Sequence, residues 1–517
     1  REFKIKTDPL PAGLPQASVS NLDKAELNSD FYFFSPATKN NKMVAYDING
    51  DIRWYLATPA LWQNTRLNNG HLLVSTERLF SAPYYMTGLY EIDLLGKIYA
   101  EYSLPGGYHH DYFELQNGNL IVATNNFENS NDTVEDYVVE LDRKTGNIVK
   151  TIDLKKILKT DDGKSENWTK QDWFHNNSVY YDRHTNSLIL SGRHQDIVVS
   201  IDYTTEKINW LLGDSTNWSS EYQNYFLKPV GDNFEYQWSQ HAAKLTPEGY
   251  LFLFDNGNNK SKDPSSYVQA ANSYSRGVLY KINAEQKTVE QIWQFGKERG
   301  SDFYSPYISD VDYLSKDHYL VHSGGIVKSD GKPSNQPAGL TEGKITLLSD
   351  TVEIKDGKII FEIKTPTNNY RVEKMDVYTG VDFSLTDAKH LGTLGVTEVS
   401  GKKQGVITDT DIDQEFLKSH KISLTNEEDR LVFSGQFKRE DQVKIALYRN
   451  FNTNFYNLKI SKNPLTALCV DVLTEDEDQN GIMVTKYINK DGLRGNYSVY
   501  IEYNGKLYNT GKYFNAN

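Results

Sequence analysis

The chain is poor in the residues that build covalent cross-links and membrane spans. Cys469 is its only cysteine among 517 residues, which excludes an internal disulfide and a cysteine-based zinc site. No apolar run approaches the roughly 18 residues that a membrane span requires, and no segment has the pattern of a signal peptide. Because the sequence begins at Arg1 rather than Met, we expect a processed or truncated chain.

The chain also lacks an excess of positive charge. Lys and Arg number 56 against 69 Asp and Glu, which gives a formal net charge of −13. Such a surface repels nucleic acid and anionic lipid, so we expect neither as a partner. Aromatic residues are abundant at 13%, with 35 Tyr and 8 Trp. This excess favours a β-rich protein, because aromatic side chains pack well on pleated sheets.

A recurring unit predicts the fold. One half of it reads VVELDRKTGNIVKTIDL from Val138 and VVSIDYTTEKINWLLGD from Val198, and the other half reads DYFELQNGNLIVAT and AAKLTPEGYLFLFDNG. Apolar residues alternate around Gly, Asn and Asp turns, as in β-hairpins. The unit occurs six times between about residues 30 and 380, at a spacing typical of propeller blades. We therefore predict an all-β chain with a six-bladed β-propeller. A β-sandwich is the alternative, but a sandwich does not repeat its sequence.

The same repeats predict three regions. Residues 1–29, with three prolines in the first fifteen positions, are expected to be a strand and linker from a missing N-terminal domain. Residues 30–380 form the predicted propeller. Residues 381–517 break the rhythm and contain alternating runs such as RLVFSGQF and YSVYIEYNGKLY. For this last region we expect a small β-sandwich-like domain of unknown role.

Three histidines share a place in the repeat, just before the second hairpin of a unit. They are His110 in GGYHHDYFEL, His175 in DWFHNNSVYY and His241 in QWSQHAAKL. His110 and His241 each lie eight residues before a turn glycine. A lone histidine is usually a satisfied polar residue, but equivalent positions of propeller blades converge at the channel. We therefore expect these three side chains to meet there. The other histidines share no position and are taken as structural: His71, His184, His194, His318, His322, His390 and His420.

Cations that match an anionic substrate accompany these histidines. Arg193 ends a hairpin in LILSGRHQD, and Lys297 lies on a glycine-flanked loop in QFGKERG. The planar guanidinium of arginine fits the oxygens of sulfate or phosphate. For Arg276 and Arg299, a structural role is as consistent with the sequence as a role in binding the anion.

The strings QHAAKL…LFDNGN, DWFHNNSVYYD…LILSGRHQD and WQFGKERGSDFYSP resemble those of the bacterial PAPS-independent aryl-sulfate sulfotransferases. The resemblance runs from about residue 2 to residue 380. It implies an enzyme that moves a sulfuryl group from an aryl sulfate to a phenol by a ping-pong reaction through a sulfohistidine. It implies no cofactor, no metal and an extracytoplasmic location. The cysteine pair of that family is not found here.

The resemblance also implies roles for individual residues. His241, which follows a glutamine, matches the histidine nucleophile of the family. His175 and Asn177 match the HNN-type motif, and Arg193 matches the arginine of the SGR motif. His110 matches the remaining histidine by repeat position, with His109 as the alternative. Lys297, or a residue near it, matches a substrate-binding lysine.

Other readings of the sequence predict different behaviour. A ligand-binding propeller would keep the repeats without the histidines and arginine, and a sulfatase would use water in place of the phenol. A quinone-dependent dehydrogenase would need a metal site and a cofactor shelf, neither of which the sequence shows. The oligomeric state is left open. Nearby aromatic residues are expected either to line an aryl pocket or to pack in the core: Tyr108, Tyr112, Trp173, Phe174, Tyr236 and Trp238.

Overall fold

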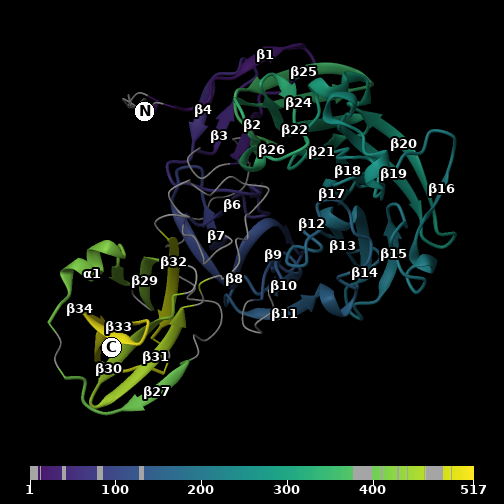
Figure 1. Ribbon diagram of the computed structural model, residues 1–517. Coiled ribbons are helices and arrows are strands. Elements are labelled where there is room, and N and C mark those ends of the chain that lie inside the picture. Colours follow the sequence, from purple (N-terminus) through teal and green to yellow (C-terminus); the bar gives the residue numbers. More distant parts are fainter. Residues whose placement is uncertain are drawn as a thin grey trace. The chain divides into compact units, whose positions relative to one another are not determined.

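The fold is built almost wholly of β-strands (Figure 1). The computed structural model describes residues 10–11, 13–37, 42–77, 85–126, 133–376, 399–408, 411–427, 430–438, 441–458, 460, 481–490 and 492–517. Within these ranges the one α-helix is α1 (Gln414–Ser419). The described 3-10 helices are η1 (Leu154–Lys156), η2 (Arg193–Gln195), η3 (Gln223–Tyr225), η4 (Pro264–Ser266), η5 (Ala270–Asn272), η6 (Lys297–Asp302) and η7 (Ala338–Leu340). The prediction of an all-β chain is confirmed.

The chain divides into two compact units, each made of two stretches of sequence. Unit 1 comprises Arg1–Asn64 and Lys228–Gly380, and unit 2 comprises Thr65–Leu227 and Val381–Asn517. The predicted boundary near residue 380 lies outside the described residues, and the three predicted regions stay predictions.

The described residues of unit 1 form three sheets. The first has the order β26-β2-β3-β4 and consists of β2 (Phe31–Pro36), β3 (Val44–Tyr46), β4 (Ile52–Tyr55) and β26 (Asn369–Met375). The second has the order β16-β20-β19-β18-β17, from β16 (Lys228–Val230), β17 (His241–Leu245), β18 (Leu251–Asp255), β19 (Arg276–Asn283) and β20 (Thr288–Phe295). The third has the order β1-β25-β24-β22-β21, with β23 on β22. Its strands are β1 (Ser18–Ser20), β21 (Asp310–Ser315), β22 (His318–Ser329), β23 (Lys332–Pro333), β24 (Ile345–Lys355) and β25 (Lys358–Thr365). The first sheet is thus completed by a strand from the far end of the unit.

Unit 2 begins with a seven-stranded sheet whose strands follow the sequence. They are β5 (Thr65–Arg66), β6 (Leu72–Ser75), β7 (Met86–Ile92), β8 (Ile98–Glu114), β9 (Leu120–Thr124), β10 (Tyr137–Leu141) and β11 (Ile148–Asp153). The first part of β8 pairs with β7, and its last part pairs with β9. One long strand therefore joins two four-stranded meanders. A separate meander follows, with β12 (Asn176–Asp182), β13 (Ser187–Gly192), β14 (Ile197–Asp202) and β15 (Ile208–Leu212).

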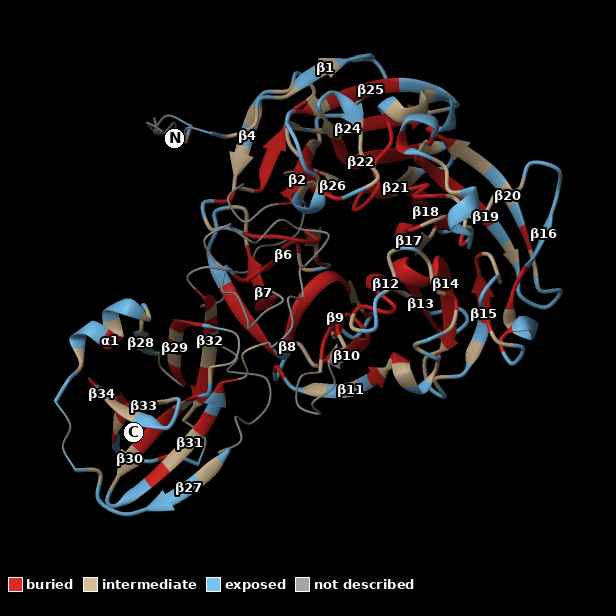
Figure 2. Cartoon of the chain, in the orientation of Figure 1, coloured by how far each residue is buried: buried red, intermediate tan, exposed pale blue. Residues whose placement is uncertain are grey.

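The inner strands of these meanders are more buried than the outer strands (Figure 2). Every residue of β9, β13 and β18 is buried, whereas β4 and β11 alternate toward solvent. The all-buried strands read as continuous apolar runs because both of their faces are covered. In unit 1, apolar residues of two neighbouring sheets share a core, as Phe252 and Phe254 do with Val321 and Val352.

The C-terminal part of unit 2 forms two further antiparallel sheets. One has the order β27-β31-β30-β33-β34 and the other β28-β29-β32. Their strands are β27 (Gly401–Gln404), β28 (Ser423–Asn426), β29 (Arg430–Phe437), β30 (Val443–Arg449), β31 (Asn452–Leu458), β32 (Ile482–Asn489), β33 (Asn496–Tyr503) and β34 (Lys506–Asn515). Arg430, which is fully buried, donates to Glu101 Oε2 at 2.7 Å and to Ser103 Oγ at 3.1 Å. This buried ion pair ties the C-terminal sheets to β8 within unit 2.

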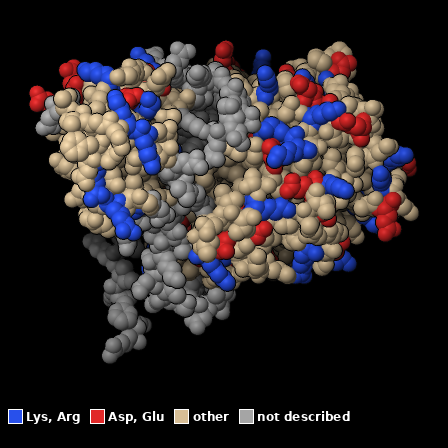
Figure 3. Space-filling view, turned by 90° about the horizontal axis from the view of Figure 1, so that it is seen from below, with Lys and Arg blue, Asp and Glu red and all other residues tan. Residues whose placement is uncertain are grey.

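The surface carries charges of both signs. On the face shown in Figure 3, Lys and Arg side chains are interspersed with Asp and Glu side chains. Among the described residues, no helix combines the length and apolar character needed to cross a membrane.

Candidate functional site

Four histidines from three separate segments of the sequence gather in unit 2. The rings of His110, within β8, and His175, just before β12, have centroids 4.9 Å apart. His194, in η2, stacks on His175 at 4.3 Å, and His109 lies against His110 at 5.1 Å. Each of the four side chains is at most 1% exposed. We call these four residues and Arg193 the histidine cluster.

Irregular backbone within β8 and at the start of β12 aims these rings at one another. Pairing with β9 is interrupted between Tyr108 and Tyr112, and pairing of β12 with β13 is interrupted between Asn176 and Val179. His110 and His175 both take left-handed φ values, 58° and 57°. Non-glycine residues seldom adopt this conformation, and bulges of this kind re-aim side chains near functional sites. Asn177 lies in the β12 bulge and is fully buried.

A glycine allows Arg193 to enter the cluster. Gly192 ends β13 directly before Arg193, and a Cβ atom at this position would lie 2.4 Å from the Phe174 ring. Any larger residue would push the strand end or Phe174 aside. The main-chain N–H of Arg193 donates to His175 O at 3.2 Å, so the arginine is fixed to the segment that carries the histidine.

His175 is held by two carboxylates. Asp172 Oδ2 accepts a hydrogen bond from His175 Nδ1 at 2.7 Å. Glu135 Oε2 lies equally close to the same nitrogen, at 2.7 Å. Burial raises the pKa of Glu135. Burial would raise the pKa of Asp172 as well, but the charge of His175 and its hydrogen bond bring it below its usual range. Nearby anions favour the imidazolium form of a histidine.

His109 and His194 are held neutral by their hydrogen bonds. His109 Nε2 donates to Thr124 O at 3.0 Å, so its Nδ1 accepts from His110 Nδ1 at 2.9 Å. His194 Nδ1 donates to Asp172 O at 2.6 Å, so its Nε2 accepts from Arg193 Nη1 at 2.9 Å. Burial lowers the pKa of His109 and of His194 to about 3. His194 therefore orients the guanidinium of Arg193.

His241 lies in unit 1 and has a different partner. It begins β17, is 1% exposed, and its Nδ1 lies 2.9 Å from Asn256 Oδ1. The amide nitrogen of Asn256 donates to Ser305 O at 2.8 Å and to Ile308 O at 3.0 Å. The amide oxygen must therefore accept from His241 Nδ1–H, which leaves the lone pair of the ring on Nε2. His241 does not share the left-handed φ of His110 and His175; its neighbour Ala242 has φ 57°.

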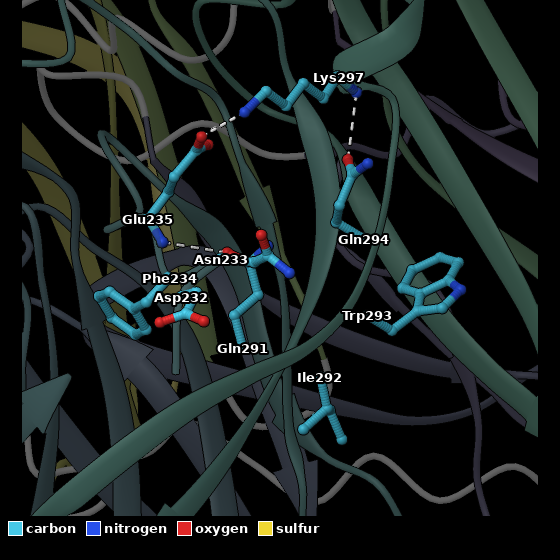
Figure 4. Close-up of a pocket in the computed structure, with 9 residues that line it drawn as sticks. All are labelled: Asp232, Asn233, Phe234, Glu235, Gln291, Ile292, Trp293, Gln294 and Lys297. Carbon is cyan, nitrogen blue, oxygen red and sulfur yellow. Dashed lines mark hydrogen bonds and ion pairs between the residues drawn. The ribbon is translucent and has the colours of Figure 1, made fainter. Parts of the chain in front are cut away.

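Lys297 lies at the edge of a pocket of about 440 Å³ in unit 1 (Figure 4). Its ammonium group forms an ion pair with Glu235, and its main-chain N–H donates to Gln294 Oε1 at 3.3 Å. Glu235 also accepts from the Tyr274 hydroxyl at 2.5 Å. A second lysine approaches the same tyrosine, since Lys260 Nζ lies 3.2 Å from the ring centroid of Tyr274. Burial lowers the pKa of Lys260 to about 8.

The two additional arginines have structural partners. Arg276 is fully buried and donates to Asp255 Oδ2 at 2.8 Å and to Gln291 Oε1 at 3.0 Å. Arg299 donates to Glu362 Oε1 at 2.7 Å and to Asp350 Oδ2 at 3.2 Å.

Most of the aromatic residues near the motifs pack in the core. Trp173 and Phe174 belong to the main apolar cluster of unit 2, and Tyr108 and Tyr112 are at most 5% exposed. Tyr236 and Trp238 are partly exposed, so they are the two that stay candidates for an aryl contact.

The sequence did not identify four of the residues that position the candidate site. His194 was taken as structural, although it directly follows Arg193. Asp172 and Asn256 lie within the recognised strings DWFHNN and LFDNGN, and this position was the available signal. Glu135 has no such signal, because the fold alone brings it to His175. Of the other histidines taken as structural, His322 bonds Thr351 and Asn369, and His71 bonds Glu91; His390 lies outside the described residues.

Among the residues that the structure describes, three sets of side chains have donor atoms within 4.8 Å of one another, as a metal site requires. They are His109/His110/Glu135, Asp172/His175/His194 and Asp310/Asp312/Glu373. In the first two sets the ring Nδ1 atoms are engaged in the hydrogen bonds given above. In the third, Lys244 Nζ lies 2.5 Å from Asp312 and 3.2 Å from Asp310 and supplies the opposite charge.

Comparison with known sequences identifies the family. The sequence model described as Arylsulfotransferase (ASST) matches residues 16–378, which is more than half of the chain. The chain belongs to the arylsulfotransferase family. Two relatives share 29% identity over 346 residues: the "Arylsulfate sulfotransferase AssT" of Lelliottia amnigena and the protein of the same name from Escherichia coli O6:H1 strain CFT073. The match covers 54% of this chain and 57% of each relative, so the chain spans little more than half of the length of these relatives.

Similarity to solved structures is weak. Kuenenia stuttgartiensis hydrazine synthase aligns with a TM-score of 0.31 at 12% identity, over 59% of this chain and 66% of that chain. Dihydro-heme d1 dehydrogenase NirN aligns with a TM-score of 0.27 at 13% identity, over 52% and 45%. Scores this low carry no conclusion about this chain.

Proposed function

We propose that this chain transfers a sulfuryl group from an aryl sulfate to a phenolic acceptor through a sulfohistidine at His241. The family match and the names of the two relatives support the reaction class. The observation that carries the proposal is the histidine cluster, in which four imidazoles and Arg193 are buried together from distant parts of the sequence. Core packing alone does not require such a collection of polar groups, because burying each of them costs free energy.

The proposed chemistry divides into two half-reactions. The Nε2 lone pair of His241 attacks sulfur, the S–O bond to the aryl group breaks, and the electron pair leaves on the phenolate oxygen. In the second half-reaction the acceptor phenol attacks sulfur, the S–N bond breaks, and His241 regains its lone pair. Sulfuryl transfer resembles phosphoryl transfer, where positioning and fixed positive charge supply most of the catalysis.

The other candidate residues bind and orient the sulfuryl group in this proposal. Arg193 supplies a fixed cation, and Asn177 supplies an amide from the β12 bulge. Lys297 supplies the second cation. No cofactor takes part. His110 and His175 are the two candidates for moving the proton of the phenol.

Two further parts of the proposal concern the setting of the reaction. The four-stranded groups described above support a β-propeller of six blades, in which β8 belongs to two of them. An extracytoplasmic location is proposed from the family resemblance.

The test is the dependence of phenol release on the acceptor. The purified chain is incubated with 4-nitrophenyl sulfate, with and without a second phenol, and nitrophenol release is measured. A transferase releases it much faster with acceptor, a sulfatase is indifferent to acceptor, and a binding protein releases none.

Mass spectrometry completes the test. A tryptic digest after exposure to donor alone should show one sulfuryl group on the peptide that contains His241. The label should be absent from His241→Ala and present in the control His184→Ala, which changes an exposed histidine. Transfer activity retained in His241→Ala would refute the proposed carrier.

A further inference from the structure

Two carboxylates that contact the histidine cluster have no part in the proposed sulfuryl transfer. Asp172 and Glu135 lie 37 positions apart in the sequence numbering, and each places one oxygen 2.7 Å from His175 Nδ1. Asp172 is 8% exposed and Glu135 1%. Their further ion pairs also run to histidines, 3.5 Å from Asp172 to His194 and 3.9 Å from Glu135 to His110. Burying two anions against one imidazole is costly unless that imidazole carries a positive charge.

The two carboxylates make different contacts. Asp172 Oδ2 accepts the hydrogen bond from Nδ1. Glu135 Oε1 accepts from the Tyr85 hydroxyl at 2.8 Å, whereas its Oε2 lies beside Nδ1 without hydrogen-bond geometry. Asp172 therefore fixes which ring nitrogen carries the permanent proton. Glu135 contributes mainly through its charge.

The other groups that face His175 do not cancel this effect. His110 approaches from β8 and its Nδ1–H donates to His109, and His194 approaches from η2 and is held neutral by its hydrogen bonds. His109 stands behind His110 and is neutral as well. Arg193 in η2 is the one fixed cation among the described groups of the cluster. Two carboxylates thus face one guanidinium, and the remaining positive charge is best carried by His175.

We propose that Glu135 and Asp172 are positioning residues that make His175, rather than His110, the proton donor to the departing phenolate. The inference rests on the proposed sulfuryl transfer. Asp172 holds Nδ1 protonated, so Nε2 is the atom that gives and takes the proton. Glu135 stabilises the imidazolium before the donor reacts.

The proton balance follows from this assignment. When the S–O bond breaks, the phenolate oxygen takes the Nε2 proton of the His175 imidazolium, and a neutral imidazole with Nδ1–H remains. In the second half-reaction the acceptor phenol returns a proton to Nε2 as its oxygen attacks sulfur. His175 is then an imidazolium again, and no external acid is consumed.

The kinetic test compares two donors with different leaving groups. Phenyl sulfate needs a proton on its leaving group, whereas 4-nitrophenyl sulfate releases a stabilised phenolate. For each donor, kcat/KM is measured from roughly pH 5.5 to 9, the range in which a histidine titrates. The variants are Glu135→Gln and Asp172→Asn. The matched control is Glu140→Gln in β10, since Glu140 also accepts from a tyrosine hydroxyl, that of Tyr203, at 2.6 Å.

We expect Glu135→Gln to lower kcat/KM for phenyl sulfate about tenfold above neutral pH and to leave 4-nitrophenyl sulfate nearly unchanged. The reason is that removing one anion lowers the pKa of His175, which moves the alkaline fall of the profile about one pH unit lower. Asp172→Asn should lower kcat for phenyl sulfate about 100-fold at every pH, because the ring loses its fixed tautomer. Glu140→Gln should behave as the wild type.

Two outcomes overturn the assignment. One is an unchanged pH profile for phenyl sulfate in Glu135→Gln. The other is an equal loss for both donors at every pH, which indicates a purely structural role. A measurement without turnover separates this inference from the proposed function: nitrogen NMR of 15N-histidine-labelled protein, with the His175 signal assigned by its loss in His175→Gln. A lower His175 pKa in Glu135→Gln supports the carboxylate effect even if the wild type transfers no sulfuryl group.

Discussion

His175 and His241 are both buried histidines at the start of a strand, but their surroundings differ in charge. His175 faces two carboxylates, and His241 faces the amide of Asn256. A carboxylate partner stabilises the protonated, charged ring. An amide oxygen accepts a hydrogen bond from the same N–H but does not stabilise the charged ring in this way. One side chain can therefore serve as an acid in unit 2 and as a nucleophile in unit 1. The partner at Nδ1 decides which role each histidine can take.

In a test of this comparison, the largest loss of kcat is expected when Arg193, the cation of the histidine cluster, is removed. Arg193→Ala should lower kcat about 10³-fold, because a fixed donor to the developing charge is worth roughly 10² to 10³ in rate. Steady-state kinetics with 4-nitrophenyl sulfate measure the loss. The stability of the variant is checked by thermal unfolding.

The matched control is Arg183→Ala. Arg183 also bonds the Nε2 of the histidine that follows it, at 3.5 Å, but on an exposed turn. It should keep wild-type kcat. Equal losses in the two variants would mean that Arg193 has no special place in the reaction.

A smaller loss of kcat is expected when the amide partner of His241 is removed. Asn256→Ala should lower kcat about 100-fold without moving the pH profile, because His241 loses the acceptor that fixes its tautomer but no charge is removed. The variant also leaves the carbonyl group of Ile308 without the Asn256 donor, at a cost of about 1–3 kcal/mol in stability. The carbonyl oxygen of Ser305 still accepts from Ser275 Oγ at 3.2 Å. Kinetics below the unfolding temperature separate the two effects.

Asn258→Ala is the control for this site. Asn258 is likewise a buried amide, and it donates to the Tyr304 hydroxyl at 3.2 Å and to Asn335 O at 2.9 Å. It should lose stability with little change in kcat. A shift of the pH profile in Asn256→Ala would contradict the view that the amide acts without charge.

Two lysines of unit 1, Lys297 and Lys260, are expected to affect the donor KM. Removing Lys297 should raise it about tenfold, and the effect of Lys260 should depend on pH. Lys297→Met should raise the donor KM about tenfold by removing one cation, an energy of about 1.4 kcal/mol. Because burial lowers the pKa of Lys260 to about 8, Lys260 is charged below that pH and neutral above it. The donor KM of the wild type should therefore rise as the pH passes 8.

In Lys260→Met this rise should disappear, and the donor KM should be high at every pH. Lys281→Met, on the exposed side of β19, is the control and should not change KM. A rise that persists in Lys260→Met would assign the titration to another group.

The sequence was a good guide to local structure and a poor guide to what surrounds each candidate residue. Hairpin signals act between neighbouring residues, so the strands of the repeats could be predicted. The shared strand β8 could not, because its 17 residues read as the end of one repeat and the start of the next. His175 was found from its motif. Glu135, its closest acidic neighbour from another segment, was not, because only tertiary contacts bring the two together. The meeting of His110, His175 and His241 at one place stays a prediction.

The smallest effect on transfer is expected from a histidine that also contacts a carboxylate but lies outside the cluster. His71 Nδ1 lies 2.7 Å from Glu91 Oε1, and Arg143 donates to both oxygens of Glu91 at 3.0 Å. Burial opposes ionisation of Glu91, but the hydrogen bonds and charge of Arg143 prevail and bring its pKa to about 2. Glu91→Gln should therefore leave kcat and its pH profile unchanged.

The same variant should lose stability in a pH-dependent way. A carboxylate whose pKa is lower in the folded protein stabilises it above the unfolded pKa, about 4.5, and that contribution is lost as the pH falls toward 2. The free energy of unfolding of Glu91→Gln should be about 3 kcal/mol below the wild type at pH 7, with the gap closing in acid. Chemical denaturation at several pH values measures it. If Glu91→Gln instead moved the pH profile of transfer as Glu135→Gln is expected to, the effect of the carboxylates on His175 would reflect only the net charge of unit 2, and the contrast between the two histidine sites would lose its structural cause.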